Sequence, residues 1–153
     1  MSLHDKSRCD DLDNPQLAAE RERAAGILES RDITPTAQRV EIARILLARP
    51  QHLSAEQVIC ALKQGELAVS KATVYNTLGL FAAKGLVREV NVDPNKVFYD
   101  SNCSDHHHFY DVDSCTLTDI DARKIAIDGL PDVPRGKVVD RVDVIVRVRS
   151  RSD

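Results

Sequence analysis

Three consecutive histidines, His106, His107 and His108, are the part of this sequence best suited to bind a metal ion. Side chains alternate between the two faces of an extended strand, so His106 and His108 share one face and His107 lies on the other. Two imidazoles on one face of a strand can chelate one ion. The alternative is a solvated surface run, although three adjacent histidines are unusual in a chain that has five in total.

Other residues can complete such a site. His52 can provide a third imidazole, and Asp100 and Asp119, at the ends of nearby predicted strands, can provide carboxylates. Three nitrogen and at least two oxygen ligands suit Fe²⁺, Mn²⁺ or Zn²⁺, and the lack of thiolates argues against copper(I). For each aspartate alone, a capping or surface role remains the alternative.

A predicted helix over residues 70–84 is the candidate for DNA recognition. Val74, Leu78 and Phe81 recur with helical spacing and form its buried stripe, which turns polar side chains outward. A helix fits the major groove, where such side chains can bond to bases or phosphates. An ordinary amphipathic helix, and a solvated surface arginine in the helix before it, are the alternatives. The candidate DNA-binding residues are Arg39, Ser70, Lys71, Thr73, Tyr75 and Asn76.

The elements around this helix predict a winged helix-turn-helix over residues 16–100, after a flexible tail of residues 1–15. Further helices are expected over residues 16–31, from Thr34 as N-cap to about residue 49, and from Ser54 to Gly65, where Ser54 and Gln57 form a capping box. Two β-rich runs, 86–92 and 96–99, flank a turn at 93–95 and predict the hairpin that forms the wing.

Residues 101–153 predict a small α/β dimerisation domain, so the fold class is α+β. Strands are expected over residues 107–112 and 116–120, and a short helix over 121–128. The alternation of valines with charged residues over 138–148 predicts a half-buried antiparallel strand. A unit of this size makes too small a core to stand alone, so we expect a homodimer.

Composition and charge exclude several classes of protein. No apolar run approaches the roughly 20 residues that span a bilayer, and the polar N-terminus does not resemble a secretory signal. We therefore expect a cytoplasmic protein with no membrane partner. The net charge is -3, but residues 15–100 carry 11 Lys/Arg and 10 Asp/Glu, so DNA binding would need help from dimerisation or metal charge. With no Trp and few aromatic residues, a pocket for a small-molecule substrate is not expected.

The four cysteines do not form a C-x-x-C pair, so neither a disulfide scaffold nor a four-cysteine structural zinc site is expected. Cys60 lies in an apolar helical stretch and is interpreted as a core thiol. Cys103 and Cys115 flank the histidines, and a metal or redox role for either stays open.

Several motifs together resemble the ferric uptake regulator family over about residues 16–148. They are Ile33-Thr-Pro-Thr-Ala-Gln-Arg39, His52-Leu-Ser-Ala-Glu56, Ser70-Lys-Ala-Thr-Val-Tyr-Asn-Thr-Leu78, Val97-Phe-Tyr-Asp100 and His106-His-His-Phe109. The resemblance implies a winged helix joined by a hinge to a dimerisation domain. It also implies a recognition helix over residues 70–83 and a regulatory metal site at His52, Asp100, His106, His108 and Asp119.

This sequence departs from most of that family where a structural zinc is expected. Asp111 and Ser114 stand where a cysteine pair would be. This sequence lacks the pair and contains Ser-Asp-His-His-His-Phe. In both respects it is similar to one branch of the family, the iron response regulators. That resemblance implies haem as a further ligand, at His106, His107 and His108, although the Cys-Pro haem motif of some members is absent here.

The leading hypothesis is therefore a dimeric transcriptional regulator of iron or haem genes that binds a pseudo-palindromic DNA operator. A peroxide-sensing repressor with Fe²⁺ or Mn²⁺ at the same ligands is the alternative, because three histidines and two aspartates also resemble that branch. A metalloenzyme is not expected, because no glutamate is placed as a general base near the histidines. A dimeric interaction module without metal is the remaining class.

Overall fold

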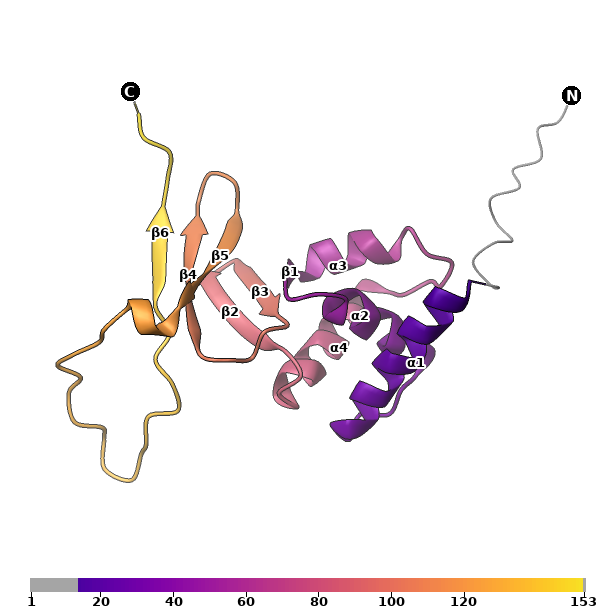
Figure 1. The fold of residues 1–153 in the computed structure, drawn as a ribbon, viewed down its shortest axis with the longest axis horizontal. Helices are drawn as coiled ribbons and strands as arrows, with labels where there is room; N and C mark the ends of the chain where they lie inside the picture. Colours follow the sequence, from indigo (N-terminus) through magenta and orange to yellow (C-terminus); the bar gives the residue numbers. More distant parts are fainter. Residues whose placement is uncertain (1–13, 153) are drawn as a thin grey trace, which may run out of the picture. The chain divides into compact units, whose positions relative to one another are not determined.

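The structure, a computed structural model, describes residues 14–152 (Figure 1). Residues 1–13 of the predicted tail therefore lie outside the described residues. Pro15, the last residue of the predicted tail, belongs to the first helix. The chain divides into two compact units at the Cys103–Ser104 bond. The prediction placed this division at residue 100. Residues 101–103 stay with the first unit, where the Ser101 N–H donates to the Gln51 carbonyl at 3.1 Å.

Four α-helices form the larger part of the first unit. They are α1 (Pro15–Ser30), α2 (Ala37–Leu47), α3 (Ala55–Leu62) and α4 (Lys71–Ala83). Ser54 and Gln57 make the predicted capping box at α3, and Ser70 caps α4. The N-cap of α2 is Thr36 rather than the predicted Thr34, because the Thr36 hydroxyl accepts the hydrogen bond from the Arg39 N–H.

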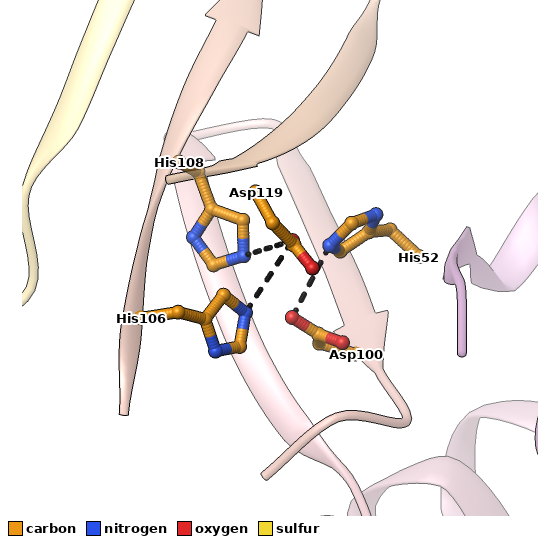
Figure 2. Close-up of side chains that lie close together, drawn as sticks. All are labelled: His52, Asp100, His106, His108 and Asp119. Atoms are coloured by element: carbon orange, nitrogen blue, oxygen red, sulfur yellow. Dashed lines mark ion pairs between the residues drawn. The ribbon is translucent and has the colours of Figure 1, made fainter. Parts of the chain in front are cut away.

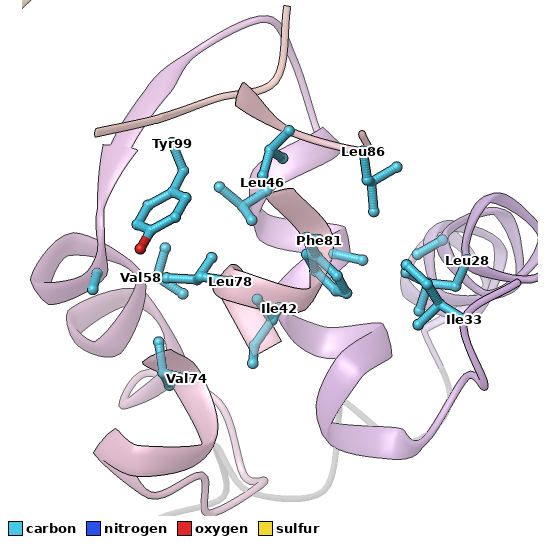
Figure 3. Close-up of a cluster of buried hydrophobic side chains, with 14 of the residues drawn as sticks. Leu28, Ile33, Ile42, Leu46, Val58, Val74, Leu78, Phe81, Leu86 and Tyr99 are labelled. Carbon is cyan, nitrogen blue, oxygen red and sulfur yellow. The ribbon is translucent and has the colours of Figure 1, made fainter. Parts of the chain in front are cut away.

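The helices pack around one apolar core, drawn in Figure 3. Val74, Leu78 and Phe81 of α4 have no exposed surface, so the predicted stripe is the buried face of this helix. Burial of such side chains contributes about 1.5–3 kcal/mol each relative to exposure, so the core holds α4 at a fixed orientation. Gly85 follows with a φ of 71°, which lets the chain leave the helix and begin the wing.

The wing is the hairpin of β2 (Arg88–Asp93) and β3 (Lys96–Asp100). A third strand, β1 (His52–Ser54), pairs antiparallel with the other edge of β3, so the sheet has the order β1-β3-β2. This short strand was not predicted from the sequence. It joins the segment before α3 to the end of the wing, and the unit is a winged helix-turn-helix.

The second unit contains a three-stranded sheet with the order β5-β4-β6. Its strands are β4 (His106–Asp111), β5 (Thr116–Asp121) and β6 (Ile145–Val148). The prediction for β6 was wrong in two respects: the strand is shorter, and it pairs parallel to β4 rather than antiparallel. The helix predicted over residues 121–128 is reduced to a 3₁₀ turn at Ala122–Lys124, and residues 125–144 have no regular structure.

Residues 14–152 thus have the predicted α+β class. Within residues 14–152, no helix is both long enough and apolar enough to cross a membrane. Cys60 is exposed, so its interpretation as a core thiol was wrong: the buried stripe of α3 is formed by Ala55, Val58 and Leu62, and Cys60 lies outside it.

Candidate functional site

His52 and Asp100 form the first group of candidate ligands, within the first unit. They are directly opposite each other in the β1–β3 ladder, and the Nε2 of His52 lies 3.2 Å from the Oδ2 of Asp100 (Figure 2). The Asp100 side chain is 1% exposed. Its other oxygen, Oδ1, accepts a hydrogen bond from the Asn102 N–H at 2.9 Å, which fixes the carboxylate with Oδ2 toward the imidazole.

His106, His108 and Asp119 form the second group, within the second unit. His108 pairs with Asp119 across the β4–β5 ladder, and His106 is two residues earlier on the same face. The Nε2 atoms of both histidines lie 3.5 Å from the Oδ1 of Asp119, and the two rings are 4.5 Å apart at an angle of 67° (Figure 2). Each side chain offers a ligand atom within 4.8 Å of the others.

A backbone contact selects the nitrogen that His106 can use as a ligand. Its Nδ1 lies 2.6 Å from the Ser104 carbonyl oxygen. Because a carbonyl can only accept, Nδ1 carries the hydrogen in this bond, and Nε2 keeps its lone pair in the neutral ring. Metal-bound histidines ordinarily have their second nitrogen oriented in this way.

His107 is separated from this group, as the alternation along the strand predicts. The Val144 N–H donates to the Nδ1 of His107 at 3.1 Å, so the ring is bound to the chain just before β6. The three histidines therefore do not present one common set of ligand atoms. Haem binding at His106, His107 and His108 stays a prediction, and at most two of these residues share a face of the sheet.

The donor atoms of both groups fit a borderline or hard divalent cation. The first group contains one imidazole and one carboxylate, and the second contains two imidazoles and one carboxylate, which are ligand types that suit Fe²⁺, Mn²⁺ or Zn²⁺. Thiols do not belong to either group. The Sγ of Cys103 lies 3.6 Å from the carbonyl oxygens of Gly85 and Leu86. The Sγ of Cys115 lies 3.9 Å from the carbonyl oxygen of Val112.

Three of the candidate DNA-binding residues line one groove of about 270 Å³ between α2 and α4. They are Arg39, Thr73 and Asn76. The guanidinium of Arg39 donates to the Thr34 carbonyl at 3.0 Å, which holds it near the start of α2. The groove therefore combines a cation with polar side chains of the kinds that can bond to bases and phosphates, and DNA binding at these residues stays a prediction.

The other three candidates are the N-cap residue of α4 and two residues elsewhere on this helix. The Ser70 hydroxyl caps the helix by accepting from the Thr73 N–H, and Lys71 is exposed at the first turn. Tyr75 is 48% exposed and lies outside the groove. Its hydroxyl donates to Glu56 Oε1 at 2.8 Å.

Comparison with known proteins identifies the group to which these features belong. The profile of the ferric uptake regulator family matches residues 30–129, which include α2 to α4, the wing, and both groups of candidate ligands. The chain belongs to the ferric uptake regulator (Fur) family. The resemblance noted in the sequence is thereby confirmed at the level of the family, whereas membership of the iron response branch stays a prediction.

Two curated Fur-family relatives illustrate the range of regulators that this chain is similar to. The ferric uptake regulation protein of Synechococcus elongatus is 38% identical over 87 residues, which cover 54% of this chain and 58% of the relative. The peroxide-responsive repressor PerR of Staphylococcus aureus is 32% identical over 89 residues, which cover 58% of this chain and 60% of the relative. The chain thus matches less than two thirds of the length of either relative.

Solved structures of the Fur family share the fold over more of the chain. The ferric uptake regulator from Pseudomonas aeruginosa with manganese has a TM-score of 0.63 and 27% identity, and covers 84% of this chain and 98% of its own. The regulator from Francisella tularensis with iron has a TM-score of 0.61 and 21% identity, over 76% of this chain and 90% of its own.

Sequence reasoning missed two features of this Fur-family site. The first is β1, whose pairing places His52 opposite Asp100. The second is Glu56, whose contact with Tyr75 joins the first turn of α3 to α4. The hydrogen bond from Tyr75 lowers the pKa of Glu56, and the same bond raises the pKa of Tyr75. Nothing in the spacing of these two residues, 19 apart, indicates that they meet.

Proposed function

We propose that this Fur-family protein is a homodimeric, metal-dependent transcriptional regulator of iron-related genes. In this proposal one Fe²⁺, Mn²⁺ or Zn²⁺ ion takes His52 and Asp100 from the first unit and His106, His108 and Asp119 from the second. The observation that carries it is the oriented donor set of the second unit, where the Nε2 atoms of His106 and His108 both point at Asp119.

Neither group of ligands offers six donor residues alone. The first offers one imidazole and one carboxylate, and the second offers two imidazoles and one carboxylate. Fe²⁺ and Mn²⁺ commonly take about six ligands, so an ion that uses both groups is better satisfied than an ion held by either. Such an ion would supply an electrostatic link between the winged helix and the second unit, and its occupancy would bias their relative orientation.

The second unit also supports the homodimer. Within the described residues its buried apolar side chains are Tyr110 and Ile120, a very small core. Phe109 is 41% exposed and pairs with Val146, which is 37% exposed, so one face of the sheet presents an apolar surface. Dimers with two winged helices bind operators whose symmetry matches their own, and we therefore propose a pseudo-palindromic DNA site.

Metal titration of the purified apo protein tests this assignment. We expect about one Mn²⁺ ion per chain to bind at this site, apart from any ions bound elsewhere. The His106→Ala/His108→Ala variant should lose this binding. His107→Ala is the matched control, because it removes an imidazole from the same strand on the other face. Circular dichroism checks that each variant is folded. Unchanged Mn²⁺ affinity in the double variant would rule the site out.

A peroxide sensor is the second candidate. It is favoured by the 32% identity to a peroxide-responsive repressor, together with a donor set of three histidines and two aspartates. In this case peroxide added to the Fe²⁺-loaded protein would oxidise a ligand imidazole. Mass spectrometry of the peptides that contain His52 and His106 decides between the candidates: one added oxygen atom supports peroxide sensing, and unmodified peptides support a regulator that responds to metal supply.

A further inference from the structure

We propose that Glu56 determines how Tyr75 contacts DNA, by holding its hydroxyl so that the oxygen can only accept a hydrogen bond from a base. The partner group would be an exocyclic amino group in the major groove, on cytosine or adenine. This inference rests on the proposed DNA-binding function, and it adds a specificity role for a residue outside the recognition helix.

The first step is the direction of the hydrogen bond. The Tyr75 hydroxyl lies 2.8 Å from Glu56 Oε1. An ionised carboxylate has no hydrogen to give, so the hydroxyl hydrogen must point at Glu56. The bond to Tyr75 is the largest cause of the lowered pKa of Glu56, which therefore remains ionised at neutral pH. The phenol stays neutral because the same bond raises the pKa of Tyr75.

The second step concerns the atoms that DNA can offer. Phosphate oxygens, like carboxylate oxygens, only accept hydrogen bonds, so they cannot pair with a hydroxyl whose hydrogen is already donated. In the major groove, the N4 amino group of cytosine and the N6 amino group of adenine are the donors. With its hydrogen directed to Glu56, Tyr75 is therefore suited to a base amino group and unsuited to the backbone.

The third step is that Glu56 is held in place from several sides. It lies in the first turn of α3, where the helix dipole favours a negative charge. A hydrogen bond from the Ser54 side chain and the positive charge of Lys96 on the wing also lower its pKa. Glu56 is thus in a position to restrain Tyr75 before DNA arrives, while Tyr75 remains 48% exposed.

Glu56 also lowers the affinity for DNA of any sequence. Its negative charge stands beside an exposed residue of the recognition helix, so it repels phosphates wherever the helix approaches DNA. A residue that weakens all binding and improves one base contact increases specificity rather than affinity. A merely structural role for Glu56 predicts neither effect.

Selection from a random DNA library by the full-length protein with Mn²⁺ tests the proposal, using wild type, Glu56→Gln, Tyr75→Phe and Glu66→Gln. Glu66→Gln is the matched control, because it removes the same charge from an exposed position between α3 and α4. We expect wild type and Glu66→Gln to prefer the same base at one position per half-site. Tyr75→Phe should lose that preference. Glu56→Gln should weaken it, because a glutamine amide can donate to the Tyr75 oxygen as well as accept from its hydroxyl, and it should bind random DNA more tightly than wild type.

Base analogues at the preferred position then distinguish the two donors. Purine lacks the amino group of adenine, and 2-pyrimidinone lacks that of cytosine. One of the two analogues should weaken wild-type binding roughly fivefold to tenfold, as expected for one hydrogen bond, and should leave Tyr75→Phe almost unchanged. Identical base preferences in wild type, Glu56→Gln and Tyr75→Phe would overturn this inference alone. Absence of any sequence preference in wild type would instead contradict the proposed DNA-binding function.

Discussion

The Nδ1 of His106 lies 2.6 Å from the carbonyl oxygen of Ser104, whereas the Nδ1 of His107 receives the N–H of Val144 at 3.1 Å. Adjacent histidines are thus held in opposite tautomers by the backbone. His106 presents Nε2 as a ligand, and neutral His107 carries its hydrogen there. His106 is therefore in the tautomer that can bind a metal through Nε2, whereas His107 forms a hydrogen bond with the segment just before β6.

The tautomers can be observed directly. In the metal-free protein at neutral pH, we predict that neutral His106 is protonated at Nδ1 and neutral His107 at Nε2. Long-range ¹H–¹⁵N correlation spectra of the imidazole rings distinguish the two forms. Each histidine serves as the control for the other, and the same tautomer in both would contradict the assignment.

Removing the charge of Asp100 should weaken metal binding without unfolding the protein. Asp100→Asn keeps the oxygen that accepts the Asn102 N–H, but it loses the anionic ligand atom that faces His52. We expect the Mn²⁺ affinity to fall by about 10- to 100-fold or more, since changes even outside the ligand set cost that much. Calorimetric titration measures it. The exposed Asp105→Asn is the control, and equal losses in both variants would indicate a general effect of charge.

The pKa of Glu56 should depend on Tyr75. The folded-state pKa of Glu56 is lowered. The ionised carboxylate therefore stabilises the fold at pH values above the ordinary glutamate pKa, and this contribution is lost as the pH falls through the lowered pKa. Tyr75→Phe removes the largest cause of the shift, and the pKa should rise toward its ordinary value. Carboxyl ¹³C titration by NMR measures it. An unchanged midpoint for Glu56 would argue against the bond.

Truncation of Leu78 should destabilise the winged helix. Leu78 is fully buried beside Phe81, and we expect Leu78→Ala to lower the free energy of unfolding by about 2–5 kcal/mol. Denaturant unfolding followed by the helical circular dichroism signal reports on this unit, because α1 to α4 all belong to it. Leu67→Ala, at a position 37% exposed, should cost less than about 0.5 kcal/mol. Similar costs for both would contradict the core assignment.

Features set by local chemistry could be predicted from the sequence. Ser54 and Ser70 cap helices because their hydroxyls meet backbone N–H groups three residues on. His106 and His108 share a face because strands alternate. In each case the cause lies within a few residues of the effect.

Features set by distant parts of the chain could not be predicted in this way. The three residues of β1 are too few to show a period, and their pairing depends on β3, more than 40 residues later. The alternation of valines around Val146 indicates a strand but does not show whether it runs parallel or antiparallel to its neighbour. The parallel pairing of β6 with β4 was therefore missed. Ile125 and Ile127, two apart, do not form a helical stripe, and the expected helix is only a turn.

The measurement that tests the central claim most directly is the affinity of the full-length protein for its selected DNA site, with and without Mn²⁺. An ion that fixes the winged helices should reduce the entropy lost on binding, so we predict that Mn²⁺ strengthens binding by about 5- to 150-fold in wild type. The His106→Ala/His108→Ala variant should show no such change. Equal affinity of the wild-type protein in both conditions would contradict the account.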